Sequence, residues 1–260
     1  MAEIDGILLD VDGVLTISWE PLPGAVETLA WLRAHGVPFR LITNTTTHTR
    51  TALAETLSDA GLVVAPSEIV TAVVATAAHL REAHPGAAVF LLSDGDARVD
   101  LEGVRLVDAD ANANVVVLGG AFEGFDYPTM NRVFRMLMDG ASLVAMHRNL
   151  YWRTSDGWQL DGGAYVAGLE EAAGTRAVVC GKPAGEHFAA ALSELGVPAD
   201  RAAMVGDDVV NDVLGAQAAG LRGVLVRTGK FREQDLAAAS GTPDLELGSI
   251  AELPDLLAPS

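Results

Sequence analysis

The stretch Ile7-Leu8-Leu9-Asp10-Val11-Asp12-Gly13-Val14-Leu15 decides how the chain is interpreted. Its apolar run over residues 7–9 is typical of a buried strand in a parallel sheet, and the run ends in acid. Residues i and i+2 of a strand point the same way, so Asp10 and Asp12 can face one crevice beyond the carboxyl edge of the sheet. Gly13 permits a sharp exit from that strand. Taken alone, the stretch fits an ordinary turn as well as an active site.

Strands and helices alternate along the rest of the chain. Apolar spacing predicts a strand over 39–42 and a helix over 47–60, which a glycine ends. After about residue 177 the pattern becomes very regular, and three more strands of the same sheet are expected at 178–180, 203–205 and 224–226. This rhythm predicts an α/β fold built from βαβ units around a parallel sheet.

A second acidic cluster, Gly206-Asp207-Asp208-Val209-Val210-Asn211-Asp212, follows the expected strand 203–205. Two acidic strand ends in one parallel sheet repel each other. Gathered carboxylates either raise each other's pKa or hold a divalent cation, and hard oxygen ligands suit Mg²⁺. We favour the metal. Asp208 fits the metal site and a position at a helix start equally well, and at a helix start it would interact with the helix dipole.

Two further strand ends supply groups that a phosphate needs. Thr43 and Asn44 follow the strand 39–42 and offer a hydroxyl and an amide as donors. Lys182 follows the expected strand 178–180 and places a cation where phosphoryl charge can be neutralised. Each signal is weak alone, because a strand-end Thr is usually a helix cap and a lone Lys is usually solvated. Together the four strand ends are specific.

In chain order these groups resemble the four motifs of the haloacid dehalogenase (HAD) superfamily, Asp-x-Asp, Thr/Ser, Lys and Gly-Asp-Asp-x-x-x-Asp. The long gap between Thr43 and Lys182 is similar to that of the NagD-type phosphatases, which insert an α/β cap domain there. The resemblance implies a Rossmann-like catalytic core with a parallel sheet over residues 1–75 and 178–260. It implies an α/β cap domain over 76–177.

The resemblance also implies a Mg²⁺-dependent phosphatase that acts on a small phosphorylated substrate through an aspartyl phosphate. Asp10 would be the nucleophile, and Asp12 would protonate the leaving alcohol and then activate water. Mg²⁺ would be held by the Asp10 carboxylate, the Asp12 backbone carbonyl and Asp207. Lys182 would be the third catalytic residue, and Asp212 would orient it or a metal-bound water.

The remaining expectations concern the phosphate and the surroundings of the metal. The substrate-binding residues would be Asp12, Gly13, Thr43, Asn44 and Lys182. Behind the metal ligands we expect Asp208, Asn211 and Asp212. A degenerate, non-catalytic HAD scaffold with a regulatory or binding role is the alternative function, although the presence of Asp12 favours hydrolysis. Sugar phosphates, nucleotides, pyridoxal phosphate, pyrophosphate and phosphoamino acids all stay open as substrates.

Within the expected cap domain, residues 148–152 and 161–164 either reach over the active site or pack the cap itself. The resemblance implies a homodimer formed through the cap. Gly181-Lys182 and Gly229-Lys230 resemble the end of a P-loop, but both lack its earlier glycine and its Ser/Thr. A dinucleotide-binding site is also unsupported, because no Gly-x-Gly-x-x-Gly follows the first strand.

The acidic composition of the chain argues against two classes of binding partner. The 260 residues carry 17 Lys+Arg and 35 Asp+Glu, a net charge of −18, so neither nucleic acid nor a membrane surface is expected as a partner. The only cysteine, Cys180, excludes an intrachain disulfide, and its apolar strand favours a place in the core over a nucleophilic role. With no signal-peptide pattern at the N-terminus, a reducing, cytoplasmic location is expected.

Overall fold

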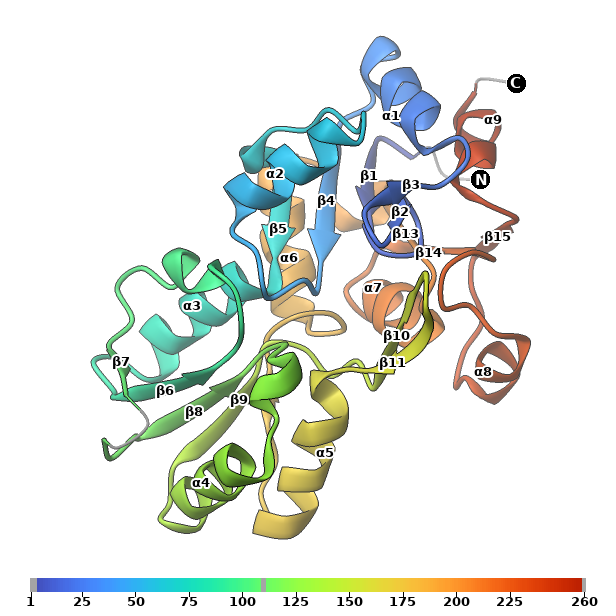
Figure 1. Ribbon diagram of the computed structural model, residues 1–260. Coiled ribbons are helices and arrows are strands. Elements are labelled where there is room, and N and C mark those ends of the chain that lie inside the picture. The colour runs from blue at the N-terminus through green and yellow to red at the C-terminus, as the bar shows by residue number, and fades with distance from the viewer. Residues whose placement is uncertain (1–3, 109–110, 259–260) are drawn as a thin grey trace.

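The computed structural model describes residues 4–108 and 111–258. Two parallel sheets divide it, and Figure 1 shows them one above the other. The upper one, the core sheet, has six strands in the order β15 (Leu245–Leu247), β14 (Arg222–Val226), β13 (Ala202–Gly206), β1 (Gly6–Leu9), β4 (Phe39–Thr43) and β5 (Ile69–Thr71). The predicted α/β architecture, with a parallel core sheet and an inserted α/β unit, is confirmed.

Helices cover both faces of the core sheet. Because successive strand residues face opposite ways, Ile7 and Leu9 pack with α1 (Ala25–Ala34), α2 (Arg50–Asp59) and the start of α9 (Leu253–Leu257). Leu8 packs on the other face with α6 (Gly185–Leu195) and α7 (Gly215–Ala218). The short helix α8 (Glu233–Ala238) follows β14. The sheet is therefore the middle of three layers.

The second sheet, the cap sheet, repeats this layering on a smaller scale. Its strand order is β12 (Val178–Val179), β9 (Ser142–Ala145), β8 (Val115–Leu118), β6 (Val89–Leu92) and β7 (Leu106–Val107). Helix α3 (Ala72–Ala83) packs on one face, with α4 (Tyr127–Met138) and α5 (Gly162–Ala173) on the other. We call this sheet with its helices the cap. Short 3-10 turns complete the chain at Pro66–Glu68, Ala97–Asp100, Phe122–Gly124, Ala199–Arg201 and Ile250–Glu252.

One predicted core strand is wrong. Residues 178–180 were expected to extend the core sheet, but Val178 and Val179 pair with β9 in the cap sheet. Cys180 packs in the same cap cluster as Met146. A run of two valines marks a strand without indicating which sheet it joins, so its partner was decided by packing rather than by local pattern.

Two hairpins, one from each part of the molecule, meet beside the space between the sheets. The first joins β2 (Thr16–Ile17) to β3 (Glu20–Pro21), and the second joins β10 (Tyr151–Thr154) to β11 (Gly157–Leu160). The turn of the first hairpin holds Ser18 at φ 50° and Trp19 at φ 67°, a conformation that side chains other than glycine rarely adopt. Ser18 Oγ accepts a hydrogen bond from Ser155 N at 3.1 Å, which ties this strained turn to the cap hairpin.

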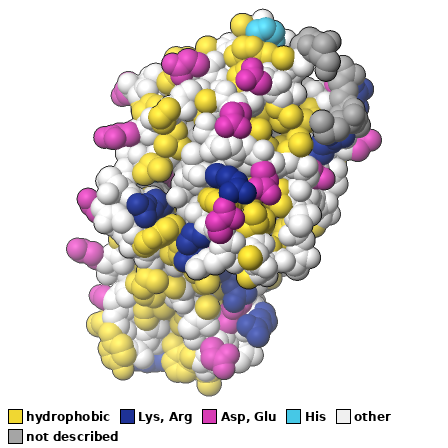
Figure 2. Space-filling model, turned by 90° about the vertical axis from the view of Figure 1, so that its right-hand side faces the viewer, with side chains coloured by type: hydrophobic (Ala, Val, Ile, Leu, Met, Phe, Trp, Pro, Cys, Tyr) yellow, Lys and Arg dark blue, Asp and Glu magenta, His cyan; other side chains and the backbone are white. Residues whose placement is uncertain are grey.

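Charge is distributed as the composition suggests. Acidic side chains are spread over the face drawn in Figure 2, with basic ones among them. Within the described ranges, no helix is both long enough and apolar enough to cross a membrane.

Candidate active site

The three central strands of the core sheet deliver the predicted site residues to one edge. Asp10 follows β1, Thr43 ends β4 and Asp207 follows β13, and β1 pairs with both of the other strands. Parallel strands end at the same edge, so adjacency in the sheet becomes adjacency of these side chains.

A buried cluster of carboxylates lies at this edge. Asp10, Asp207 and Asp212 each offer one oxygen, and these three atoms lie within 4.8 Å of one another. Lys182 Nζ is 2.7 Å from Asp10 Oδ1 and 2.8 Å from Asp212 Oδ1. Burial alone would lower the pKa of Lys182, but the two carboxylates raise it. Lys182 is therefore a cation, although its side chain is only 2% exposed.

The wide turn after β13 folds the acidic stretch back on itself. A π-helix over Val209–Leu214 brings Asp212 Oδ2 to 3.0 Å from Asp208 N, which donates to it. A Cβ on Gly206 would lie 2.2 Å from the Asp212 side chain, so only glycine fits there. Such π-helical turns occur often at functional sites. This turn places Asp212 beside Lys182.

Asp207 is clamped between two glycines and lacks one partner. A Cβ on Gly13 or Gly229 would approach Asp207 Oδ2 to 1.9 or 2.1 Å, so glycine is required at both positions. Asp207 Oδ2 accepts from Lys230 N at 2.7 Å, whereas Asp207 Oδ1 is buried without a hydrogen bond from any described residue. Burial raises the pKa of Asp207 well above its usual range. A buried acceptor without a partner beside two more carboxylates fits a site for a hard cation.

Asp12 lies beside this cluster and not inside it. Its carboxylate is half-buried, and Thr45 Oγ1 donates to Asp12 Oδ2 at 3.4 Å. Burial raises the pKa of Asp12, with Lys230 and Lys182 opposing the rise. A carboxyl group with a raised pKa more readily carries a proton that it can give away.

Thr43 and Asn44 occupy the neighbouring loop, with different partners. Thr43 Oγ1 accepts from Thr45 N at 3.1 Å. The side chain of Asn44 grips the backbone of Lys182: its Oδ1 accepts from Lys182 N at 2.9 Å, and its Nδ2 donates to Lys182 O at 3.1 Å. Asn44 stays a predicted phosphate-binding residue, and its side-chain amide also holds the backbone of Lys182.

Asp208 and Lys230 form an ion pair that sequence reasoning missed. Asp208 Oδ1 accepts from Val210 N and Asn211 N, both at 2.9 Å, so Asp208 does cap the following turn. Its Oδ2 also lies 3.0 Å from Lys230 Nζ. Although burial acts against it, this cation helps to lower the pKa of Asp208 to about 2. The Gly229-Lys230 pair was visible in the sequence, but no spacing rule connected it with the acids.

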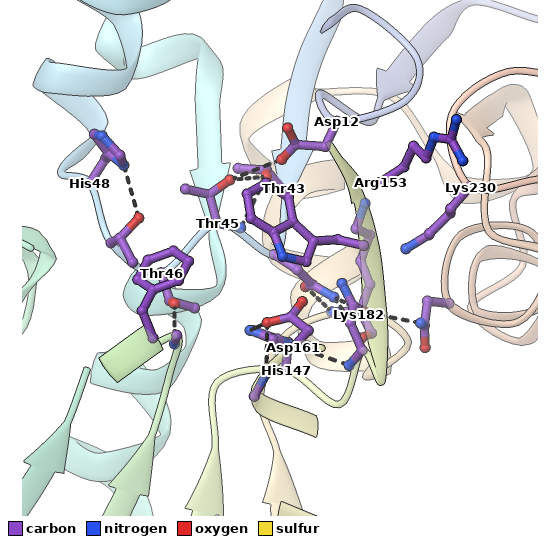
Figure 3. A pocket seen from close by; sticks show the side chains of 18 of the residues that line it. Asp12, Thr43, Thr45, Thr46, His48, His147, Arg153, Asp161, Lys182 and Lys230 are labelled. Carbon is purple, nitrogen blue, oxygen red and sulfur yellow. Dashed lines mark hydrogen bonds and ion pairs between the residues drawn. The ribbon is translucent and has the colours of Figure 1, made fainter. Parts of the chain in front are cut away.

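The cap encloses the site from the other side and leaves a cavity of about 770 Å³. Figure 3 shows some of the side chains that line it, among them Asp12, Thr43 and Lys182 from the core and Arg153, His147 and Asp161 from the cap. Of the cap residues whose place was open, Asn149, Trp152, Asp161 and Gly162 line this cavity. Tyr151 does not: its hydroxyl donates to Asp235 of α8 at 2.9 Å.

Aromatic rings from both parts of the molecule line the cavity. Trp19 and His48 come from the core, and their ring centroids are 5.2 Å apart in an edge-on arrangement. Phe122 and Trp152 come from the cap, with centroids 6.4 Å apart. These rings give the cavity wall apolar surface that can hold an organic group.

Cys180 is 5% exposed, and burial raises the pKa of its thiol to about 11. A thiol that stays protonated is a poor nucleophile, so the predicted buried, non-nucleophilic position of Cys180 is confirmed, although it packs in the cap and not in the catalytic core.

Comparison with known proteins agrees with this geometry. Residues 7–106 match the family described as haloacid dehalogenase-like hydrolase, and residues 179–253 match the family described as HAD-hydrolase-like. The chain belongs to the HAD superfamily. It is a HAD-like hydrolase, and the predicted resemblance to this superfamily and its NagD-like branch is confirmed.

The HAD relatives match nearly the whole chain. Haloacid dehalogenase-like hydrolase domain-containing protein 2 of Bos taurus is 38% identical over 252 residues, covering 97% of this chain and 95% of the relative. Phospholysine phosphohistidine inorganic pyrophosphate phosphatase of Rattus norvegicus is 36% identical over 263 residues, with 99% and 95% covered. The p-nitrophenyl phosphatase from Archaeoglobus fulgidus superposes with a TM-score of 0.88 at 29% identity, covering 98% of this chain and 100% of that one. NagD from E. coli K-12 gives 0.83 at 27% identity, with 96% and 98% covered.

Proposed function

We propose that this HAD-like hydrolase is a Mg²⁺-dependent phosphatase that cleaves a small-molecule phosphate monoester, or a related phosphoanhydride or phosphoamide, through an aspartyl phosphate. The observation that carries the proposal is the buried group of Asp10, Asp207 and Asp212 in contact with Lys182, with Asp12 beside it. Relatives named as p-nitrophenyl phosphatase and as phospholysine phosphohistidine inorganic pyrophosphate phosphatase support the same reaction class.

Asp10 and Asp207 would hold the cation, together with the backbone carbonyl of Asp12. The unpartnered Oδ1 of Asp207 supports this assignment, since a ligand would satisfy it. When bound, Mg²⁺ supplies positive charge that offsets the charge of the phosphoryl oxygens. Asp212 is engaged by Lys182 at 2.8 Å, which supports a role in orienting that lysine.

The covalent step uses Asp10 as the nucleophile. Its contacts with Val11 N and with Lys182 Nζ both use Oδ1, so Oδ2 is the oxygen we assign to attack on phosphorus. As the new O–P bond forms, the bond to the leaving group breaks, and Asp12 gives its proton to the departing oxygen or nitrogen. Asp12 then takes a proton from the water that attacks phosphorus, which frees Asp10 and releases inorganic phosphate.

Positive charge and donors next to Asp10 would receive the phosphoryl oxygens. Lys182 supplies a fixed ammonium group, Thr43 supplies a hydroxyl, and the backbone at Gly13 faces the same end of the cavity. Fixed donors stabilise developing charge without reorganising during the reaction. The aromatic rings of the cavity wall would hold the leaving group, and the volume of the cavity fits a small molecule.

Hydrolysis of para-nitrophenyl phosphate tests the proposal directly. We expect turnover by the purified protein with Mg²⁺, none with EDTA, and a loss of at least about a thousandfold in Asp10→Asn. Full activity in Asp10→Asn would remove Asp10 as the nucleophile. No turnover on this ester or on a panel of phosphorylated metabolites would favour the alternative, a regulatory or binding protein on a HAD scaffold.

The domain boundaries and the homodimer are two further proposals. The predicted division was residues 1–75 and 178–260 for the catalytic core and 76–177 for the cap domain. The packing of α3 on the cap sheet and the pairing of β12 argue for moving the two boundaries to about residues 71 and 180. A homodimer through the cap is a further prediction, which sedimentation velocity measures.

A further inference from the structure

Three segments of the chain come unusually close where the cap joins the core, those that follow β4, β9 and β12. Gly181 N donates to Met146 O at 2.8 Å. A Cβ on Gly181 would lie 2.4 Å from Asn44 Oδ1 and 2.5 Å from Met146 O. Because such distances leave no room for a side chain at position 181, the three segments are in fixed contact.

Asn149 is the cap residue that reaches across this junction. Its Oδ1 accepts from Asn44 Nδ2 at 3.3 Å and from Asn211 Nδ2 at 3.0 Å. Its backbone is held within the cap, since Gly163 N donates to Asn149 O at 2.9 Å and Asn149 N donates to His147 Nδ1 at 3.3 Å. A Cβ on Gly163 would lie 2.4 Å from Asn149 O, so glycine is what allows α5 to begin there. The cap therefore sets the position of the Asn149 backbone, from which its side chain reaches Asn44 and Asn211.

The hydrogen bonds of Asn149 connect, through Asn44, to the backbone of Lys182 and, through Asn211, to Asp208. Asn44 Nδ2 is shared between Asn149 and the carbonyl of Lys182, while Asn44 Oδ1 accepts from Lys182 N. Asn211 Nδ2 also donates to Asp208 Oδ2 at 2.7 Å. A shift of the Asn149 oxygen thus displaces the amide that fixes the Lys182 backbone, and with it Nζ beside Asp10.

We propose that Asn149 is a positioning residue: from the cap, and through Asn44, it sets the position of Lys182 for phosphoryl transfer. This inference rests on the proposed phosphatase function. It implies that docking of the cap on the core completes the active site, in addition to shaping the space for the leaving group. A displacement of about 1 Å in such a group is enough to cost a large part of the rate.

If Asn149 only supported the fold, its replacement would lower stability as well as kcat. If Asn149 is replaced, Asn44 Nδ2 still has the Lys182 carbonyl and Asn211 Nδ2 still has Asp208, so no buried donor loses its only acceptor. The stability cost of losing the bridge should therefore be small. A large change in kcat without a change in stability distinguishes positioning from support.

Asn149→Leu keeps the approximate shape but removes the acceptor, and Leu150→Ala in the same segment is the matched control. With para-nitrophenyl phosphate and Mg²⁺ we expect Asn149→Leu to lower kcat about tenfold, with KM within about twofold and an unchanged denaturant midpoint. Asn149→Asp, which restores the acceptor, should recover most of the lost kcat. Leu150 is half exposed, and its variant should behave like the wild type.

Wild-type kcat in Asn149→Leu, or an equal loss in Leu150→Ala, would overturn the proposal. So would an Asn149→Asp variant as slow as Asn149→Leu. Calorimetric titration with orthovanadate and Mg²⁺ gives a readout without turnover, in which Asn149→Leu should bind about tenfold more weakly than the wild type. If the wild type binds orthovanadate but hydrolyses no substrate, the proposed phosphatase function fails. The role of Asn149 is rejected separately if Asn149→Leu and the wild type bind orthovanadate with equal affinity.

Discussion

The core sheet and the cap sheet have the same α/β/α layering, yet their carboxyl edges carry different chemistry. Both edges face one cavity: Asp10, Thr43 and Asp207 follow core strands, whereas Gly120 and His147 follow cap strands. The core edge gathers buried carboxylates around a buried lysine, whereas the cap edge contributes glycine backbone, aromatic rings and the separate acids Asp94 and Asp96. Topology thus decides where a ligand can bind, and the side chains at each edge decide what happens to it.

If catalysis belongs to the core edge, Asp12→Asn should have the largest effect among the variants considered below. The amide cannot give or take a proton, so we expect kcat to fall about 10²- to 10⁴-fold. The loss should be greater for an alkyl phosphate than for para-nitrophenyl phosphate, because nitrophenolate leaves readily without a proton. Steady-state kinetics on both substrates checks this. Equal losses on the two esters would count against Asp12 as the acid.

The same edge should be costly to disturb in the folded state. Lys182→Met leaves Asp10 and Asp212 buried without their cation, so we expect a loss of about 3–5 kcal/mol in the free energy of unfolding at pH 7. Urea denaturation without Mg²⁺ measures it. Arg33→Met is the control, since it breaks an exposed pair with Glu68 and should cost no more than about 1 kcal/mol. Equal losses of unfolding free energy in the two variants would mean that the buried ion pairs of Lys182 matter no more to stability than the exposed Arg33–Glu68 pair.

Beneath Lys182, His187 makes stability depend on pH. Burial lowers its pKa from 6.5 to about 3 in the folded state, so between these values the unfolded chain binds more protons. The stabilisation is therefore present above about pH 6.5 and is lost as the pH falls. We expect the free energy of unfolding to drop by about 2 kcal/mol more between pH 7 and pH 5 in the wild type than in His187→Leu. Parallel pH profiles of the two proteins would contradict this.

The smallest effect is expected at the cap edge. Trp152→Ala should raise KM for para-nitrophenyl phosphate about three- to tenfold and leave kcat within about twofold, because it removes contact with the leaving group only. Trp158, on the same hairpin and 47% exposed, provides a matched Trp→Ala control with little effect on either constant. A fall in kcat for Trp152→Ala as large as that for Asp12→Asn would contradict the assignment of catalysis to the core edge and of leaving-group binding to the cap.

The sequence was most informative where an apolar run ended in a polar group. That pattern located Asp10, Thr43 and Asp207 at strand ends, and neighbouring parallel strands then had to bring them together. It was least informative in loops. Lys230 follows β14 without any spacing that relates it to Asp208, and their 3.0 Å contact exists only through the pairing of β14 with β13.

The cap shows a second limit. Two valines at 178–179 predicted a strand correctly but not its sheet, since both sheets present similar apolar faces. The segment 148–152 was predicted either to reach over the active site or to pack the cap, but nothing in it distinguished Asn149, because an asparagine after a strand usually marks a turn. Its partners, Asn44 and Asn211, are distant in sequence and meet it only in the folded chain.

The burial of Cys180 has a practical consequence. Since this single thiol is shielded and remains protonated, the protein behaves toward thiol-reactive dyes almost as if it had no cysteine. Cysteines introduced at Val63 on the core, 68% exposed, and at Tyr127 on the cap, 82% exposed, would then be the only readily labelled positions. A donor and an acceptor dye placed there would report the separation of cap and core as phosphate is added, in a background that needs no prior removal of native thiols.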